Sequence, residues 1–238
     1  MSEAAASRTP GGAHPLDAVV WNALTTQQRR FAIGDERARR FPAAIAPFAA
    51  LAGEDAESFA ALRALIEPQR PVALVTPGEI ALPAGFSVLR HVTLLQMLWQ
   101  GEPDSTPACE HVRLGVADVP DMVALATATE PGPFGPRTIE LGEYLGVRKA
   151  GKLAAMAGER MRLDGYTEIS AVCVDPEFRG QGHAAGLMKL LIAGIRARAE
   201  TPFLHVLTSN HGAIALYRRL GFVERRQMHL MVLGAAAD

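Results

Sequence analysis

The spacing of hydrophobic and polar positions changes along the chain and divides it near residue 105. From Leu16 to about Glu67, Ala, Leu, Arg and Glu dominate and apolar residues recur at helical spacing, as in SFAALRALI, which predicts a helical segment. The apolar runs PVALVTP and GFSVLRHVTLLQMLW are typical of strands. The stretch QGEPDSTPACE is rich in turn-forming residues, and we expect a boundary between two lobes there.

The pattern after this boundary predicts an α+β domain. HVRLGV is typical of a strand, ADVPDMVALATAT of a helix, and PGPFGPRT of a loop, because proline lacks a backbone donor and fixes its own φ. The runs EYLGVRK, KLAAMAGERMRL and YTEISAVCV predict an antiparallel meander. A helix from Gly182, the strand FLHVLTS, the helix NHGAIALYRRLG and the strand FVERRQMHLMVL complete the predicted order.

Two strand-like segments are similar in sequence. GFSVLRHVTLLQM, which begins at Gly85, aligns without gaps to GFVERRQMHLMVL, which begins at Gly221, and each follows a run that starts with proline, PVALV or PFLHV. An ancient duplication would explain this similarity, with residues 16–105 as a degenerate half. Chance similarity of two edge strands that follow a glycine turn is the simpler explanation.

Composition and charge narrow the class of protein. Hydrophobic residues make up 49% of the 238 positions and charged residues 21%, which is typical of a folded globular chain. The formal net charge of −1 provides no overall attraction to nucleic acid or to an anionic membrane, and we expect neither as a partner.

No apolar window is long enough to cross a bilayer. Residues 1–15 lack the apolar stretch of a secretory signal and are interpreted as a flexible tail. The two cysteines, Cys109 and Cys173, have no metal-ligand spacing, so we expect no metal and a cytoplasmic protein with reduced thiols.

The stretch DPEFRGQGHAAG, from Asp175 to Gly186, lies between a predicted strand and a predicted helix. Gly180 and Gly182 can adopt positive φ and let the backbone approach a ligand closely, and the free N–H groups at a helix N-terminus attract anions. Arg179 can add a charge-assisted hydrogen bond. A plain strand-to-helix turn is the simpler alternative. The spacing also fits a dinucleotide fingerprint with Glu200 as its acidic residue, but Glu200 precedes the next strand instead of ending it, which argues against that class.

The segment RGQGHA resembles the phosphate-binding signature of the GNAT superfamily of acyl-CoA-dependent N-acetyltransferases, and NHGAIALYRRLGF resembles its second motif. The resemblance covers about residues 110–233, and TEISAVCV and PFLHV are most similar to the glycine N-acyltransferase subgroup. It implies a GNAT fold, a mixed and mostly antiparallel sheet with flanking helices, for a domain of residues 106–238 beside an N-terminal α/β lobe of residues 16–105. It also implies acetyl-CoA as cofactor. The residues that would bind it are Val172, Cys173 and Val174 at the pantetheine arm, Arg179, Gly180, Gln181, Gly182, His183 and Ala184 at the pyrophosphate, and Asn210.

Acetyl transfer to an amine needs a base for the amine and an acid for the departing thiolate. By resemblance Glu168 is the candidate base and Tyr217 the candidate acid. A carboxylate paired with a neighbouring cation, and a tyrosine that packs beside Leu216, are the structural alternatives. We expect Phe134 and Arg137, in the proline-rich loop, to line the acceptor pocket, and Arg137 would suit a substrate carboxylate.

The predicted function is therefore transfer of an acetyl group from acetyl-CoA to a small-molecule amine or amino acid. A non-catalytic acyl-CoA sensor and a protein or peptide N-acetyltransferase are the alternatives. The acceptor stays open at this point. An exposed C-terminal strand could also pair two copies into a homodimer.

Overall fold

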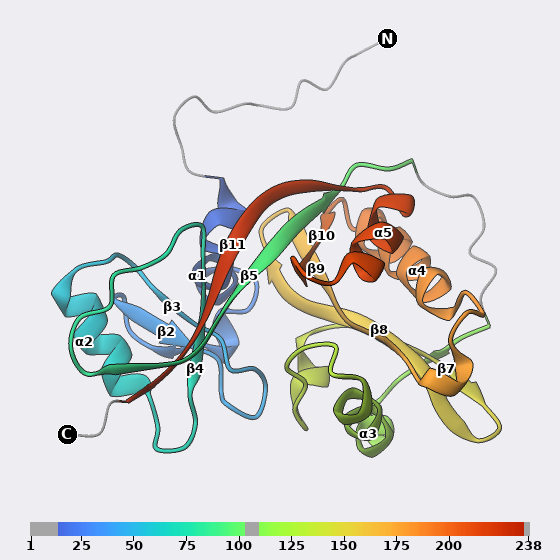
Figure 1. Ribbon diagram of the computed structural model, residues 1–238, viewed down its shortest axis with the longest axis horizontal. Helices are drawn as coiled ribbons and strands as arrows, with labels where there is room; N and C mark the ends of the chain where they lie inside the picture. Colours follow the sequence, from blue (N-terminus) through green and yellow to red (C-terminus); the bar gives the residue numbers. More distant parts are fainter. Residues whose placement is uncertain (1–13, 103–109, 236–238) are drawn as a thin grey trace, which may run out of the picture.

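The computed structural model describes residues 14–102 and 110–235, and all structural statements concern these residues (Figure 1). The predicted boundary near residue 105, Cys109 and most of the predicted tail lie outside them. The α-helices are α1 Val19–Thr25, α2 Ala56–Leu65, α3 Val119–Thr129, α4 His183–Ala197 and α5 His211–Arg219. The short 3-10 helices are η1 Pro15–Ala18, η2 Arg29–Phe31, η3 Val116–Asp118, η4 Thr138–Leu141 and η5 Pro176–Phe178.

The described strands form two sheets. The small sheet contains β1 Ile33–Gly34, β2 Ala38–Arg40 and β3 Ala49–Leu51 in chain order. The large sheet has the order β4-β11-β5-β10-β9-β8-β7-β6. Its strands are β4 Val72–Thr76, β5 Phe86–Trp99, β6 Val112–Arg113, β7 Tyr144–Lys149, β8 Lys152–Leu163, β9 Tyr166–Val174, β10 Thr201–Leu207 and β11 Phe222–Ala235. All neighbours pair antiparallel except β9 and β10, so the predicted mixed, mostly antiparallel sheet is confirmed.

The prediction of a helical segment from Leu16 to Glu67 is wrong in its middle. Helices α1 and α2 occupy its two ends, but β1, β2 and β3 lie between them. Gly34 has φ +118, and an added Cβ would lie 2.2 Å from the carbonyl oxygen of Ala38, so the chain turns there without a side chain. Pro42 and Pro47 then prevent a continuous helix. Tertiary packing overrides the helical propensity of this Ala-rich region.

The two long strands β5 and β11 form the centre of the large sheet and run side by side across the molecule in Figure 1. They pair antiparallel from Phe222–Trp99 to Ala235–Phe86. The strands that precede the two long strands in sequence pair across: β4, which precedes β5, pairs with β11, and β10, which precedes β11, pairs with β5. The four strands β4-β11-β5-β10 are therefore symmetric about the β5–β11 pair, whereas β9, β8, β7 and β6 extend the sheet on one side. The sheet contains strands from both predicted lobes.

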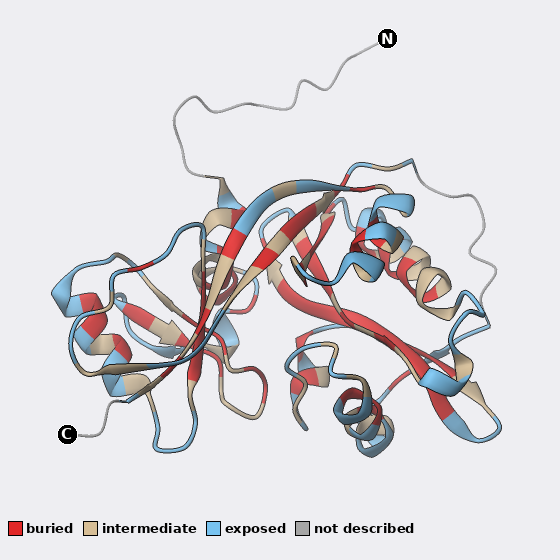
Figure 2. Cartoon of the chain, in the orientation of Figure 1, coloured by how far each residue is buried: buried red, intermediate tan, exposed pale blue. Residues whose placement is uncertain are grey.

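The predicted meander is confirmed as β7-β8-β9, and β8 is its buried centre. Figure 2 shows β8 red along nearly its whole length. Alternate residues face opposite layers: Ala155 and Ala157 pack in the cluster that contains α4 residues, whereas Met156 packs with residues of α3. Helix α4 buries Leu187, Met188, Leu191, Ile192 and Ile195, as its predicted periodicity requires.

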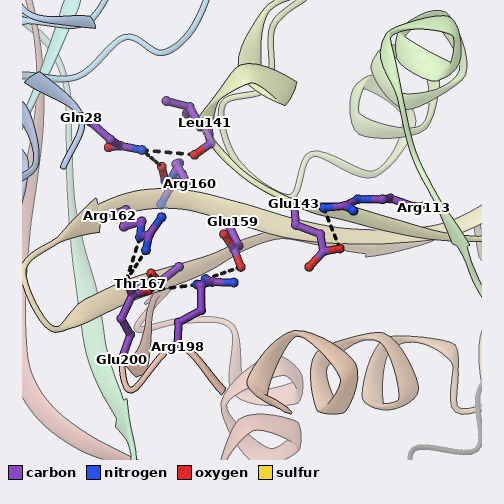
Figure 3. A network of polar contacts seen from close by, with 10 residues as sticks. All are labelled: Gln28, Arg113, Leu141, Glu143, Glu159, Arg160, Arg162, Thr167, Arg198 and Glu200. Carbon is purple, nitrogen blue, oxygen red and sulfur yellow. Dashed lines mark hydrogen bonds and ion pairs between the residues drawn. The ribbon is translucent and has the colours of Figure 1, made fainter. Parts of the chain in front are cut away.

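Strands β9 and β10 separate after a short paired segment and form a V. Their Cα partners run only from Thr201–Tyr166 to Phe203–Glu168. Figure 3 shows the polar network beside this closed end. The Glu200 carboxylate accepts hydrogen bonds from Arg162, at 2.8 and 2.5 Å, and from the Thr167 hydroxyl at 2.5 Å. The network ties the start of β10 to β8 and β9, and Glu200 has a structural role there.

Candidate active site

A cleft of about 1220 Å³ opens where β9 and β10 separate. Its lining combines the loop before α4, the ends of β9 and β10, and one face of α5 with residues of β4, β5, β8 and β11. Among the predicted site residues, Phe134, Val172, Cys173, Val174, Arg179, Gly180, Gln181, Gly182, His183, Ala184, Asn210 and Tyr217 line it. The fold therefore gathers most of the predicted set around one cavity.

The loop before α4 has the geometry of an anion-binding site. Gly180 has φ +77 and Gly182 has φ +79, and no atom lies within 4 Å of a Cβ built on either residue. Both positions thus need glycine for their backbone conformation, and the space beside them is open. Gly182 caps α4 without a side-chain hydrogen bond, so the first amides of the helix remain available to a ligand. Arg179 is exposed beside them, and its Nε donates a long 3.4 Å hydrogen bond to the Val174 carbonyl.

The end of β9 offers backbone groups to the same cleft. Ala171 has φ +52, and the register with β8 shifts between the Met156–Cys173 and Gly158–Ser170 pairs, which marks a bulge. Beyond it, residues 172–174 have β8 on one side and the cleft on the other, because β10 has already diverged. An extended ligand with amide groups fits between these strands as an additional strand would. The Cys173 thiol lies in this wall, and burial raises its pKa to about 11, so it stays protonated at neutral pH.

Tyr217 and Asn210 both come from α5. Tyr217 lines the cleft, and its ring packs against that of Phe222 with centroids 6.1 Å apart. Burial, with a smaller contribution from Cys173, raises the pKa of Tyr217 to about 12. The phenol therefore carries its proton at neutral pH. Asn210 caps α5, since its Oδ1 accepts a hydrogen bond from the Ala213 amide at 3.1 Å.

Glu168 lies fully buried at the closed end of the V, and it is not among the residues that line the cleft. Arg160 donates to both of its carboxylate oxygens, at 2.9 and 2.6 Å, and His205 Nδ1 lies 2.8 Å from Oε1. Burial by itself would raise the pKa of this carboxyl, but the charge and hydrogen bonds of Arg160, with the hydrogen bond from His205, lower the pKa to about 2. Glu168 is thus held as an anion, and Arg160 and His205 stand between it and the cleft.

A buried hydrogen-bond chain fixes the tautomer of His205. Arg225 donates to Gln96 Oε1 at 2.6 Å, which orients the amide so that Gln96 Nε2 is the donor. That Nε2 lies 2.9 Å from His205 Nε2, which must accept. The remaining ring proton of the neutral imidazole is then on Nδ1, directed at Glu168. Both ring nitrogens of His205 are therefore engaged.

The proline-rich loop divides its two predicted residues. Phe134 lines the cleft and packs edge-to-face on Tyr144, with ring centroids 5.6 Å apart. Arg137 lies outside the lining, because its exposed guanidinium makes two hydrogen bonds to Glu140, at 2.6 and 2.8 Å.

Several lining residues have no counterpart among the predicted set. They come from the N-terminal region and from β8, β10 and β11, and they include Phe48, Val75, Arg90, Val92, Arg160, His205 and Val232. Alternation along β5 was the one sequence signal that could place Arg90 and Val92 on a common face. Sequence alone gave no indication that this face borders the cleft.

Comparisons with known proteins bear directly on this geometry. The model of the FR47-like protein family matches residues 144–231, the segment that contains β7–β9, the glycine loop, α4 and α5. A solved acetyltransferase of the GNAT family from Novosphingobium aromaticivorans is 44% identical, with a TM-score of 0.89, and the alignment covers 94% of this chain and 100% of that one. The chain belongs to the GNAT family of acetyltransferases. The family prediction made from the loop residues is thereby confirmed.

Two curated relatives of this GNAT chain are named for protein acetylation. It is 36% identical to the N-alpha-acetyltransferase RimI of Mycobacterium tuberculosis over 99 residues, which is 40% of this chain and 61% of the relative. It is 41% identical to the ribosomal protein bS18-alanine N-acetyltransferase of Escherichia coli over 75 residues, 31% of this chain and 50% of the relative. The matches thus span one half to three fifths of these relatives.

No helix in residues 14–102 and 110–235 has the length and apolarity that a membrane crossing requires. Across the same ranges, no cluster of three or more His, Cys, Asp or Glu side chains has a geometry that could hold a metal ion.

Proposed function

We propose that this GNAT chain transfers the acetyl group of acetyl-CoA to the primary amine of a small molecule or amino acid. The observation that carries the proposal is the pair of positive-φ glycines at the N-terminus of α4, beside the open arm of the V. Gly180, Gly182 and the first amides of α4 would hold the diphosphate, with Arg179 beside them. The backbone of residues 172–174 would accompany the pantetheine arm. Asn210, already a helix cap, is proposed as a further contact to the cofactor.

Acetyl-CoA supplies an activated thioester. In the proposed reaction the acceptor nitrogen bonds to the acetyl carbon, the carbon–sulfur bond breaks, the nitrogen loses a proton and the sulfur gains one. We assign the proton for sulfur to Tyr217, because the phenol lines the cleft and is protonated at neutral pH. With a pKa of about 12 the phenol is a weak acid, so it acts chiefly by donating a hydrogen bond to sulfur as negative charge develops there.

Two roles for Glu168 agree with its ion pair, and they predict different pH profiles. As the base that was predicted, it would act through an intervening water, and its low pKa would leave no acidic limb from this carboxyl above pH 4. As an anchor, it would only orient Arg160 and His205 at the cleft, and the acceptor would enter as the free amine. These roles are separated by measuring kcat/KM against pH with several acceptors whose amines differ in pKa. An acidic limb that moves with the acceptor pKa supports the anchor, whereas a profile without such a limb supports the base.

The test of the proposed function combines binding with turnover. Calorimetric titration with coenzyme A should give saturable binding, and incubation with acetyl-CoA and a panel of primary amines should release free thiol. Coenzyme A binding without thiol release for any acceptor would favour the acyl-CoA sensor. The absence of both would remove the proposal.

Acetylation of a protein N-terminus is a second candidate, because both curated relatives are named for N-alpha or ribosomal-protein acetylation. A peptide that begins with alanine belongs in the acceptor panel for this reason. Membership of the glycine N-acyltransferase subgroup, a cytoplasmic location and a homodimer remain further proposals. Size-exclusion chromatography with light scattering tests the homodimer directly.

A further inference from the structure

The acceptor side of the cleft has a floor of apolar side chains from three paired strands. Val232 of β11 pairs with Ala73 of β4 and with Arg90 of β5, and Leu230 pairs with Val75 and Val92 in the same way. All six residues line the cleft. Because directly paired residues point to the same face, they form two cross-strand rows on one surface. Val92, Leu230 and Val232 are only partly buried, although their neighbours in the core are closed to solvent.

The walls above this floor combine an aromatic side chain with an arginine whose charge is neutralised by an ion pair. The Phe48 ring lies under the Arg160 guanidinium, whose carbon is 4.9 Å from the ring centroid. Arg160 is paired with Glu168, and both ring nitrogens of His205 are engaged. The floor strands, Phe48, Arg160 and His205 therefore offer no free anion to a second positive charge on the acceptor, and the Glu130 carboxylate in the lining comes from the end of α3 instead. A large apolar body would lose its hydration at little cost.

Arg90 is the exception at the far end of the floor. Its guanidinium forms no hydrogen bond or ion pair with any residue in the described part of the chain, yet Arg90 lines the cleft. Arg90 precedes Val92 by two residues on β5, which is about 7 Å along the strand. Arg160 is paired with the Glu168 carboxylate. The other two arginines of the lining lie on the cofactor side, Arg179 in the loop before α4 and Arg219 at the end of α5. A cation at the end of an apolar surface is suited to an anion at the end of an apolar body.

We propose that the acceptor is an amine whose apolar body ends in a carboxylate, with the body on the Ala73–Val75, Val92–Leu94 and Leu230–Val232 surface and the carboxylate at Arg90. The inference rests on the proposed function, since it concerns the partner of the same transfer. Apart from Leu230, the residues whose side chains form this surface lie outside residues 144–231, so the family-matched segment does not by itself determine this specificity.

The first experiment measures acceptor preference with matched chemical series. Straight-chain ω-aminocarboxylates of increasing length, n-alkylamines of the same length, α,ω-diamines and an alanine-initiated peptide are compared by thiol release from acetyl-CoA. We expect the aminocarboxylates to have the lowest KM, with an optimum at an intermediate length, and the diamines to be the poorest small acceptors. Preference for diamines or for the peptide would overturn the inference while leaving acetyl transfer intact. The absence of thiol release with every acceptor would instead count against the proposed function.

The second experiment uses Arg90→Gln with Arg29→Gln as the matched control, because Arg29 is also exposed but lies outside the lining. Arg90→Gln should raise the KM for the best aminocarboxylate about 10-fold, with kcat and the KM for the alkylamine unchanged. Calorimetry on the coenzyme A complex should show the same loss of aminocarboxylate affinity, and the affinity for coenzyme A itself should not change. Equal KM values for Arg90→Gln and Arg29→Gln would overturn the proposal.

Discussion

The cofactor side and the acceptor side of the cleft differ in how the chain builds them. The cofactor side is nearly continuous in sequence, from the bulge at Ala171 to the start of α4 at His183, and it presents backbone groups. The acceptor side joins side chains from Phe48, β4, β5 and β11 across more than 180 positions of sequence. Backbone amides suit a ligand with invariant phosphates, whereas side chains can vary with the acceptor. This difference supports the proposal that one side holds the cofactor and the other selects the acceptor.

Glu168 lies at the junction of the two sides, and changing it should have the largest effect. Glu168→Gln leaves the buried Arg160 guanidinium without its anion, so we expect a loss of ~3 kcal/mol in the free energy of unfolding. Urea denaturation measures it. The matched control is Glu140→Gln, which removes an exposed ion pair and should cost less than ~1 kcal/mol. Equal losses in the two variants would contradict the structural importance of the buried pair.

The same ion pair predicts a pH dependence of stability. The pKa of Glu168 is lowered from 4.5 to about 2, so its contribution is fully present above pH 4.5 and is lost as the pH falls toward 2. The midpoint of denaturation in urea should therefore decrease in this window, and the decrease should be smaller in Glu168→Gln. A wild-type midpoint that does not change between pH 5 and pH 2.5 would contradict it.

Gly182→Val separates the cofactor side from the rest of the fold. Valine disfavours φ +79 and its side chain would enter the open space beside the first amides of α4, so we expect the Kd for coenzyme A to rise by about 100-fold. Gly151→Val is the matched control, because Gly151 has φ +78 and open space as well but lies in the β7–β8 turn, outside the cleft. Both variants should lose similar stability, and only Gly182→Val should lose coenzyme A binding in calorimetry. Unchanged binding in Gly182→Val would remove the loop from the site.

Tyr217→Phe tests the chemistry without changing either surface. Loss of the phenol proton should lower kcat by about 10- to 100-fold, while the Kd for coenzyme A stays the same. Because the pKa of Tyr217 is about 12, the wild-type rate should show no decline from this phenol below pH 10. Tyr144→Phe is the control, since the Tyr144 hydroxyl is buried without a hydrogen-bond partner in the structure and lies outside the lining. A kcat that falls equally in both variants would exclude a specific role for Tyr217.

Val92→Thr makes the smallest change and addresses only the acceptor side. Threonine has nearly the shape of valine but adds a hydroxyl to the apolar floor, so the KM for an apolar acceptor should rise about 5-fold. Val223→Thr, at an exposed position of β11 outside the lining, should leave KM unchanged. Steady-state kinetics at saturating acetyl-CoA measures both. An unchanged KM in Val92→Thr would remove the floor from acceptor binding.

The symmetry around the β5–β11 pair extends the comparison to the two halves of the chain. The similar segments from Gly85 and Gly221 become the two central strands, and the strand that precedes each one pairs with the other. We propose that this exchange reflects a duplication in which residues 16–105 are the degenerate half. In that half, β4 is followed by a loop and β5 without a helix like α5, and the helix before β4, α2, has its first amides capped by the Asp55 carboxylate. This region therefore has no equivalent of the amides that surround the cofactor side.

Features that depend only on neighbouring residues could be predicted from the sequence. The glycines of the loop, the periodicity of α4, the alternation of β7–β9 and the cap of α5 at Asn210 all follow from local backbone chemistry. These features predicted the family and the cofactor side of the cleft. The same local rules were wrong for residues 33–51, where packing around Phe41 and Phe48 outweighed helical propensity.

Contacts between side chains on different strands could be known only from the folded structure. The pairing of Arg160 with Glu168 and the position of Arg90 on the cleft depend on strand register. No local pattern encodes these relations, because a carboxylate or guanidinium has the same propensities whether its partner is buried, exposed or a ligand. The protonation state of Glu168 and the shape of the acceptor pocket are therefore properties of the folded chain.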